Sequence, residues 1–140
     1  MRYLGLDLGT RTLGISISDI TKTIASAYKT IRFEENDYIS LLPILKEIID
    51  EYQISKIILG YPKNMNNTIG DRANTTMEFK QMLEENLKVE VVMQDERLST
   101  KEAHFYMIKA DMSRKKRKQK VDSLAANIIL QTYLDKEKGR

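Results

Sequence analysis

The sequence predicts an α/β fold in which helices cover both faces of a mixed central sheet of about five strands. Residues 3–18 alternate between apolar and polar or small side chains, which is typical of two paired antiparallel strands. Apolar residues then recur at helical spacing between Leu41 and Tyr52. The apolar run 56–60 ends at glycine, as a buried parallel strand does. The length of 140 residues predicts a single domain over 1–140.

The stretch around Asp7 organises the rest of the chain. Three leucines at every second position from residue 4 to residue 8 alternate with Tyr3, Gly5 and Asp7. This period places Asp7 near the end of the first strand, where we expect it to face open space. An unpaired carboxylate is costly to bury, so Asp7 needs a reason to be there, and Gly5 on the same face lets another group come close. The plainer alternative is a strand-end aspartate that accepts hydrogen bonds from turn amides.

The middle of the chain predicts three further strands, two helices and a polar loop. Ser40 is the expected N-cap of the first helix, which places Pro43 in the first turn, where proline is tolerated. Phe79 and Leu83 lie on one side of the second helix. The expected elements are a strand over 23–33, a helix that follows Ser40, a strand over 56–60, a polar loop over 61–68, a helix over 70–87 and a strand over 89–93.

The last third of the chain predicts two helices. Ser99 and Glu102 match a capping box, so we expect a helix of about ten residues to follow. Residues 110–120 are expected to form a basic loop or a frayed helix. The final helix begins near Val121 and is apolar on most sides, so it should be well buried.

Charge and composition restrict the partners. Six basic residues and no acid lie in residues 113–120, and without these six of the chain's 23 lysines and arginines the 20 acidic residues are in the majority. Such a local patch indicates a polyanionic partner. The chain has no cysteine and one histidine, so any metal would bind carboxylate oxygens, which favours magnesium or manganese over zinc. Because no apolar signal segment or membrane-length run is present, we expect a cytoplasmic protein.

Four motifs, each at the end of a predicted element, follow one another over nearly the whole chain. They are Gly5-Leu6-Asp7-Leu8-Gly9 with Gly14; Gly60-Tyr61-Pro62 with Asn64, Gly70 and Arg72; Asp95-Glu96-Arg97-Leu98-Ser99-Thr100 with Glu102-Ala103; and Val121-Asp122 with Ala125-Ala126 and Ile129-Leu130.

In this order the motifs resemble the pre-16S ribosomal RNA nuclease family, also described as Holliday-junction-resolvase-like (the YqgF type), within the RNase H-like fold. The resemblance implies one RNase H-like nuclease domain, with Asp7, Glu96 and Asp122 as catalytic and metal-binding acids. The physical argument agrees, because Asp7 and Glu96 lie at strand ends, where sites gather in open α/β sheets. We expect Asp122 to open the last helix, where the helix dipole favours an anion. The alternatives are a solvated Glu96–Arg97 pair and an ordinary helix-terminal carboxylate at Asp122.

A metal follows from the clustered acids. Carboxylates that share a site repel one another, so a divalent cation, Mg²⁺ or Mn²⁺, is their expected partner. Two such ions about 3.5–4 Å apart can activate water and stabilise the leaving oxygen of a phosphodiester. Many RNase H-like nucleases supply a fourth acid one turn from the last, but this chain has Ala125 there and Gln119 nearby. A second tightly held ion therefore depends on ligands from the substrate phosphate.

The candidate nucleic-acid contacts are basic or amide side chains near these acids. Arg97 either steadies the scissile phosphate or pairs with Asp95 or Glu96. Arg72 near a helix N-terminus opposes the dipole, which favours an anion-facing role. Asn64 is either a substrate contact or ordinary turn chemistry. The full set is Arg11, Asn64, Arg72, Arg97, Arg114, Lys115, Lys116, Arg117, Lys118 and Lys120.

Four functions stay open from the sequence. The first is a metal-dependent endonuclease that cleaves structured RNA in the 5′-end processing of precursor 16S ribosomal RNA. Such an enzyme would bind RNA rather than DNA and would act on the ribosome or its precursors. It would be a monomer or weak homodimer. The second is a Holliday junction resolvase, which would work as a two-fold dimer. The third is an actin-like or sugar-kinase ATPase, because Asp-Leu-Gly-Thr resembles that phosphate loop, although those proteins need two such domains. The fourth is a nucleic-acid-binding module without catalysis.

Overall fold

The computed structural model describes the backbone of residues 1–61, 71–95 and 114–139, and the side chains of these except residues 71–73, 95 and 114–123. The elements follow in the order β1-β2-β3-η1-α1-β4-α2-β5-α4. The helix predicted after Ser99, like Asn64, Glu96 and Arg97, lies outside the described residues. Of the helices in the described part of the chain, none is both long enough and apolar enough to cross a membrane.

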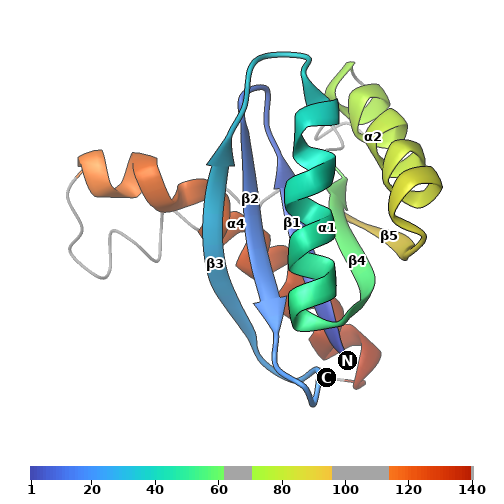
Figure 1. The fold of residues 1–140 in the computed structure, drawn as a ribbon. Coiled ribbons are helices and arrows are strands. Elements are labelled where there is room, and N and C mark those ends of the chain that lie inside the picture. The colour runs from blue at the N-terminus through green and yellow to red at the C-terminus, as the bar shows by residue number, and fades with distance from the viewer. Residues whose placement is uncertain (62–70, 96–113, 140) are drawn as a thin grey trace.

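Five strands form one mixed sheet in the order β3-β2-β1-β4-β5 (Figure 1). β1, β2 and β3 form an antiparallel meander, whereas β4 runs parallel to β1 and β5 runs parallel to β4. This sheet confirms the predicted fold class, and it places the C-terminal ends of β1, β4 and β5 at one edge. The strands are β1 (Arg2–Leu8), β2 (Thr12–Ser18), β3 (Ala25–Arg32), β4 (Ile54–Tyr61) and β5 (Glu90–Asp95).

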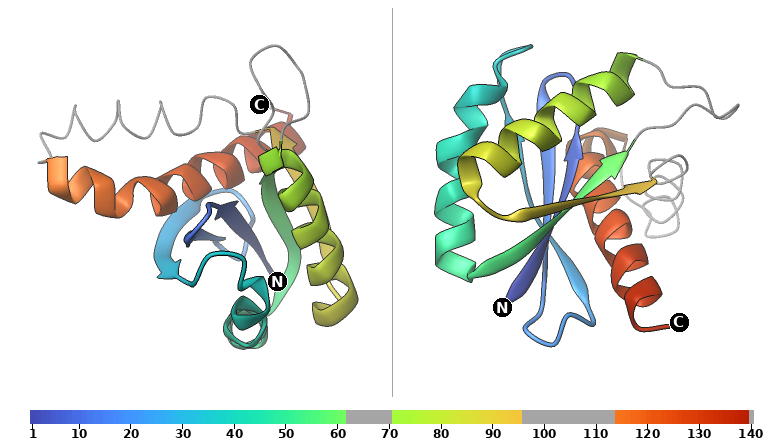
Figure 2. Two further views of the ribbon diagram at one scale, coloured as in Figure 1. Left: turned by 90° about the horizontal axis from the view of Figure 1, so that it is seen from above. Right: turned by 90° about the vertical axis from the view of Figure 1, so that its right-hand side faces the viewer.

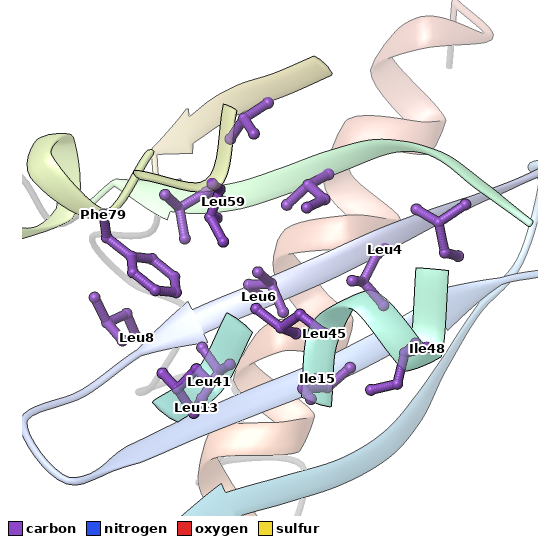
Figure 3. Close-up of a cluster of buried hydrophobic side chains, with 14 of the residues drawn as sticks. Leu4, Leu6, Leu8, Leu13, Ile15, Leu41, Leu45, Ile48, Leu59 and Phe79 are labelled. Carbon is purple, nitrogen blue, oxygen red and sulfur yellow. The ribbon is translucent and has the colours of Figure 1, made fainter. Parts of the chain in front are cut away.

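Two helices cover one face of the sheet (Figure 2). The larger core lies beneath them. Leu4, Leu6 and Leu8 point from β1 into this core, where they meet Leu45 and Phe79 (Figure 3). The predicted alternation is therefore confirmed, because every second side chain of β1 is apolar and faces the helices. The helices are α1 (Leu41–Tyr52) and α2 (Asp71–Leu87).

The helix α4 (Arg114–Glu137) crosses the opposite face of the sheet, and its N-terminal part extends past β3 (Figures 1 and 2). A second, smaller core joins it to the sheet, in which Tyr3 of β1 packs against Ile129, Leu130 and Leu134 of α4. Helices thus cover both faces, as predicted.

The start of α1 differs in detail from the prediction. Ser40 precedes the helix, as predicted, and Pro43 lies in the first turn. The Ser40 hydroxyl, however, donates to the carbonyl of Asp37 over 2.9 Å and makes no capping bond to α1. The reason is that Tyr38–Ser40 forms a 3-10 turn (η1), which gives Ser40 a helical backbone conformation instead of the extended one that a capping serine needs.

Candidate active site

Asp7 lies near the end of β1, the central strand of the sheet, and is only 6% exposed. Because it alternates with Leu6 and Leu8, which face α1 and α2, Asp7 faces the side that α4 covers. The expectation that Asp7 faces open space is therefore wrong. The strand pattern could not reveal the helix from the far end of the chain that packs on this face.

Gly5 brings α4 unusually close to β1 on the same face as Asp7. A Cβ atom at Gly5 would lie 2.7 Å from Cβ of Leu130 and 3.0 Å from the carbonyl oxygen of Ala126. No side chain fits in that space, so glycine is required there by close approach of the helix. The prediction that Gly5 lets another group come close is confirmed, and the group is the backbone of α4.

The direction of α4 carries residue 122 toward Asp7. Tyr3 of β1 meets Glu137 near the end of α4, whereas Gly5 meets Ala126 and Leu130, so the helix runs antiparallel to β1. Asp7 lies two residues beyond Gly5, about 6.6 Å along the strand. Residue 122 lies one helical turn before Ala126, about 6 Å along the axis. Residues 7 and 122 therefore lie at nearly the same distance from the contact between Gly5 and Ala126, both toward the C-terminal end of β1.

The N-terminus of α4 corrects two predictions. The helix begins at Arg114, so Asp122 lies more than two turns inside it and does not open it. The dipole argument for Asp122 is therefore wrong, because that field fades within the first turn. Residues 114–120 of the basic run form the first two turns of α4, so for them the predicted alternative of a loop is wrong. These basic residues at the N-terminus of α4 oppose the helix dipole, and the first turn contains no acidic residue. The local sequence therefore does not explain why the helix begins at Arg114.

Asp95, the residue before Glu96, ends β5 in register with Tyr61 of β4. Because β1, β4 and β5 are parallel neighbours, their C-terminal ends share the sheet edge that holds Asp7. Two strand spacings separate β5 from β1, which is about 10 Å. Glu96 itself lies outside the described residues, but the strand that leads to it ends at the same edge as Asp7.

A buried hydroxyl lies in the same row of the sheet as Asp7, two strands away. Asp7 pairs in register with Gly14, which carries no side chain, and Gly14 pairs with Thr30. The Thr30 hydroxyl and the amide oxygen of Asn127 on α4 are buried without a hydrogen-bond partner in the described part of the chain. Buried oxygens of this kind are normally satisfied by water or an ion. The carboxylate oxygens of Asp7 are ligands of the kind that Mg²⁺ and Mn²⁺ prefer, although no group of three metal-ligating side chains occurs within the described residues alone.

The candidate nucleic-acid contacts fall in different parts of the structure. Arg11 lies in the turn between β1 and β2, where its exposed guanidinium is 3.4 Å from a carboxylate oxygen of Glu35. Such an exposed pair contributes about 0–1 kcal/mol, so it does not prevent Arg11 from binding an anion. Arg72 is the second residue of α2, near its N-terminus as predicted, while its side chain lies outside the described residues.

The sequence interpretation missed two residues near this site. The hydroxyl of Ser16 on β2, fully buried, donates to the Ala126 carbonyl over 2.9 Å. Arg32 is exposed at the end of β3, and it makes no ion pair in the part of the chain that the structure describes. Its neighbour Ile31 packs against the core under α1, so alternation places Arg32 on the α4 face. The sequence did hold a signal for Ser16: it lies between Ile15 and Ile17 in a strand predicted to pair with the one that contains Gly5.

A hollow of about 330 Å³ lies at the other end of the meander. Arg2, Ser18, Ile24 and Tyr52 are among the residues that line it. Arg2 begins β1, so this hollow is separated from Asp7 by the length of that strand. It is therefore not part of the candidate active site.

The strand order, the acid at the end of the central strand and the closing helix packed on it define a protein of the RNase H-like class. Two solved structures share this fold over nearly their whole length. RuvC of T. thermophilus in complex with a Holliday junction substrate has a TM-score of 0.59 at 11% identity, covering 99% of this chain and 96% of that one. The Fowlpox virus resolvase in complex with Holliday junction DNA has a TM-score of 0.62 at 12% identity, covering 98% of this chain and 99% of that one.

The chain belongs to the RuvX family, whose model is described as Holliday junction resolvase and matches residues 1–136. A relative from Geobacillus sp. (strain WCH70) is 50% identical over 135 residues, which is 96% of this chain and 98% of the relative. One from Caldanaerobacter subterraneus subsp. tengcongensis is 45% identical over 140 residues, or 99% of each chain. Both are named "Putative pre-16S rRNA nuclease". The family predicted from the motifs is thereby confirmed.

Proposed function

We propose that this protein is a metal-dependent endonuclease that hydrolyses phosphodiester bonds in structured RNA, and that it processes the 5′ end of precursor 16S ribosomal RNA. The observation that carries the proposal is a buried carboxylate, Asp7, at the end of the central strand against the helix that contains Asp122. The names of the full-length relatives support the choice of substrate.

Asp7, Glu96 and Asp122 are the proposed ligands of a divalent cation, Mg²⁺ or Mn²⁺. When bound, such a cation supplies an activated water and neutralises charge on the phosphate. The protein's own part is to hold three carboxylates at one sheet edge: Asp7 from β1, Glu96 after β5 and Asp122 from α4. Burial of Asp7 limits the freedom of its carboxylate, which favours a fixed ligand geometry.

The proposed substrate contacts lie around this edge. The basic turns of α4 and the arginines at 11, 72 and 97 would bind phosphates, with Asn64 as a further polar contact. We add Arg32, because it is exposed on the α4 face at the same end of the sheet as Asp7. Phosphate contacts of this kind position the nucleic acid without reading its sequence.

The finer assignments are also part of the proposal. The protein would act as one domain over residues 1–140, in the cytoplasm, on the ribosome or its precursors, and as a monomer or weak homodimer. A Holliday junction is the second candidate substrate, and the family description favours it. A resolvase cuts two strands symmetrically and would have to be a two-fold dimer.

In the test, the purified protein is incubated with labelled precursor 16S RNA, with a four-way DNA junction or with unbranched controls. Each reaction contains Mg²⁺, Mn²⁺ or a chelator. We expect metal-dependent cleavage of the RNA, and loss of at least about 100-fold in activity for Asp7→Asn, Glu96→Gln and Asp122→Asn. Asp50→Asn, at an exposed position on α1, is the matched control and should retain full activity. If only the DNA junction is cleaved, the substrate is branched DNA and the proposal of an RNA substrate is wrong. Full activity in Asp7→Asn would refute the proposed active site.

A further inference from the structure

Gly5 and Ser16 form the seat on which α4 rests. They are register partners on β1 and β2, so they lie side by side on the face that α4 covers. A Cβ atom at Gly5 would overlap the Ser16 hydroxyl oxygen and would lie 2.7 Å from Cβ of Leu130 and 3.0 Å from the Ala126 carbonyl oxygen. Strand, hydroxyl and helix backbone thus meet at one point.

The two residues of the seat act in complementary ways. Gly5 permits the close approach, because it presents no side chain to the helix. Ser16 fixes that approach, because its buried hydroxyl donates to the Ala126 carbonyl over 2.9 Å. A helical carbonyl already accepts a bond within its own helix, so this second bond serves to attach the helix to the sheet.

The seat lies next to the two proposed ligands. Asp7 follows Gly5 by two residues on the same face, and residue 122 precedes Ala126 by one turn. Any change in the gap between Gly5 and Ala126 is therefore passed to the gap between the backbones of Asp7 and Asp122 with little room for compensation. Metal affinity is sensitive to such changes, because residues that orient ligands commonly affect it 10- to 100-fold, as an order of magnitude.

We propose that Ser16 is a positioning residue, which sets the separation of Asp7 and Asp122 by holding Ala126 of α4 against Gly5. This inference rests on the proposed function for its effect on metal binding, but the seat itself is a property of the metal-free fold.

Ser18 offers a matched control on the same strand and face. It is buried like Ser16. Its hydroxyl accepts a hydrogen bond from the Tyr3 amide over 2.8 Å and donates one to the Asp19 carbonyl over 3.0 Å. Neither partner belongs to α4. Ser18→Ala therefore removes a buried hydroxyl without removing a hydrogen bond to α4.

The experiment compares Ser16→Ala and Ser18→Ala with the wild-type chain in three measurements. Amide hydrogen exchange of the metal-free protein reports on α4, where Ser16→Ala should speed exchange over residues 124–131 about two- to tenfold relative to Ser18→Ala. Titration with Mn²⁺ alone, followed by electron paramagnetic resonance, should give a Kd about tenfold weaker only in Ser16→Ala. In RNA cleavage, Ser16→Ala should lower kcat about 10- to 100-fold with an unchanged KM.

The outcomes separate this inference from the proposed function. If the wild type binds Mn²⁺ and cleaves RNA but the two variants match each other in all three measurements, the role of Ser16 is overturned and the proposed function stands. If the wild type neither binds Mn²⁺ nor cleaves RNA, the proposed function fails, and with it the effect of Ser16 on metal binding. In that case, equal exchange in the two variants would overturn the seat as well.

Discussion

The ammonium of Lys56 on β4 donates a 3.1 Å hydrogen bond to the hydroxyl of Tyr133 on α4. The same nitrogen lies 3.6 Å from a carboxylate oxygen of Glu137 and 3.7 Å from one of Glu90. Burial lowers the pKa of Lys56, but the hydrogen bond and the electrostatic interaction with Tyr133, followed by those with Tyr3 and Glu90, outweigh this and raise it. Lys56 therefore attaches the C-terminal turns of α4 to the sheet, while Ser16 attaches its middle.

Replacing Lys56 should loosen this end of the helix. We expect Lys56→Met to lower the free energy of unfolding by about 1.5–3 kcal/mol, because a partly buried, charge-assisted hydrogen bond is lost. Urea unfolding measures the change. Lys46→Met removes the same charge from an exposed position on α1 and should have little effect, so equal destabilisation by both variants would contradict the anchor.

The β2–β3 turn should weaken in acid. The hydrogen bond from the Thr21 hydroxyl, followed by those from the amides of Thr23 and Ile24, lowers the pKa of Asp19 to about 2. Since this pKa is below the unfolded value of about 3.9, the stabilisation is complete above that value and is lost as the pH falls through about 2. Titration of the Asp19 carboxyl by NMR should give a midpoint near 2. A midpoint near its ordinary value would contradict the assignment.

Adding a methyl group at Gly5 should destabilise the protein more than the same change at Gly9. A Cβ at Gly5 meets Leu130 at 2.7 Å, whereas at Gly9 the nearest atom is the Thr12 hydroxyl oxygen at 3.1 Å. We expect Gly5→Ala to cost about 1–3 kcal/mol or more, as overpacking does in tight cores. Thermal unfolding of the two variants measures the difference. A smaller loss at Gly5 than at Gly9 would show that α4 is free to move away from the sheet.

Neutralising the basic turns of α4 should weaken RNA binding in a salt-dependent manner. If about three of the six cations touch phosphate, their replacement by glutamine should flatten the slope of log affinity against log salt by roughly 2–3 units. Affinity should fall about equally for all RNA sequences. Glutamine at Lys136 and Lys138, exposed at the other end of the chain, is the control. An unchanged slope would mean that the substrate reaches Asp122 by another path.

Local patterns in the sequence were sufficient for the sheet and for the helices α1 and α2. The leucines of β1 alternate because one face of that strand lies in the larger core. Ile57, Ile58 and Leu59 of β4 form an apolar run because both faces of that strand are covered, with Ile57 and Leu59 in the larger core and Ile58 in the smaller one. The position of Ser40 before α1 was predicted correctly, but the capping hydrogen bond expected from its hydroxyl is not formed. The reason is the 3-10 turn at Tyr38–Ser40, which depends on the chain that precedes it.

Contacts between distant parts of the chain could not be predicted. The burial of Asp7 and the hydrogen bond of Ser16 depend on α4, which is more than 100 residues away in the sequence. The early start of α4 was missed because consecutive basic residues at a helix N-terminus oppose the dipole and resemble a solvated loop. The grouping of Asp7, Glu96 and Asp122 stays a prediction, based on the strand ends and on the direction of α4.

The most direct test of the proposed site is a crystal of this protein soaked in Mn²⁺ and examined by anomalous scattering. The arrangement predicts an anomalous peak about 2–2.5 Å from carboxylate oxygens of Asp7, Glu96 and Asp122, and no such peak in an Asp7→Asn crystal treated in the same way. A soaked crystal without a peak at Asp7, or with any two of these carboxyl groups more than roughly 10 Å apart, would contradict a shared metal site.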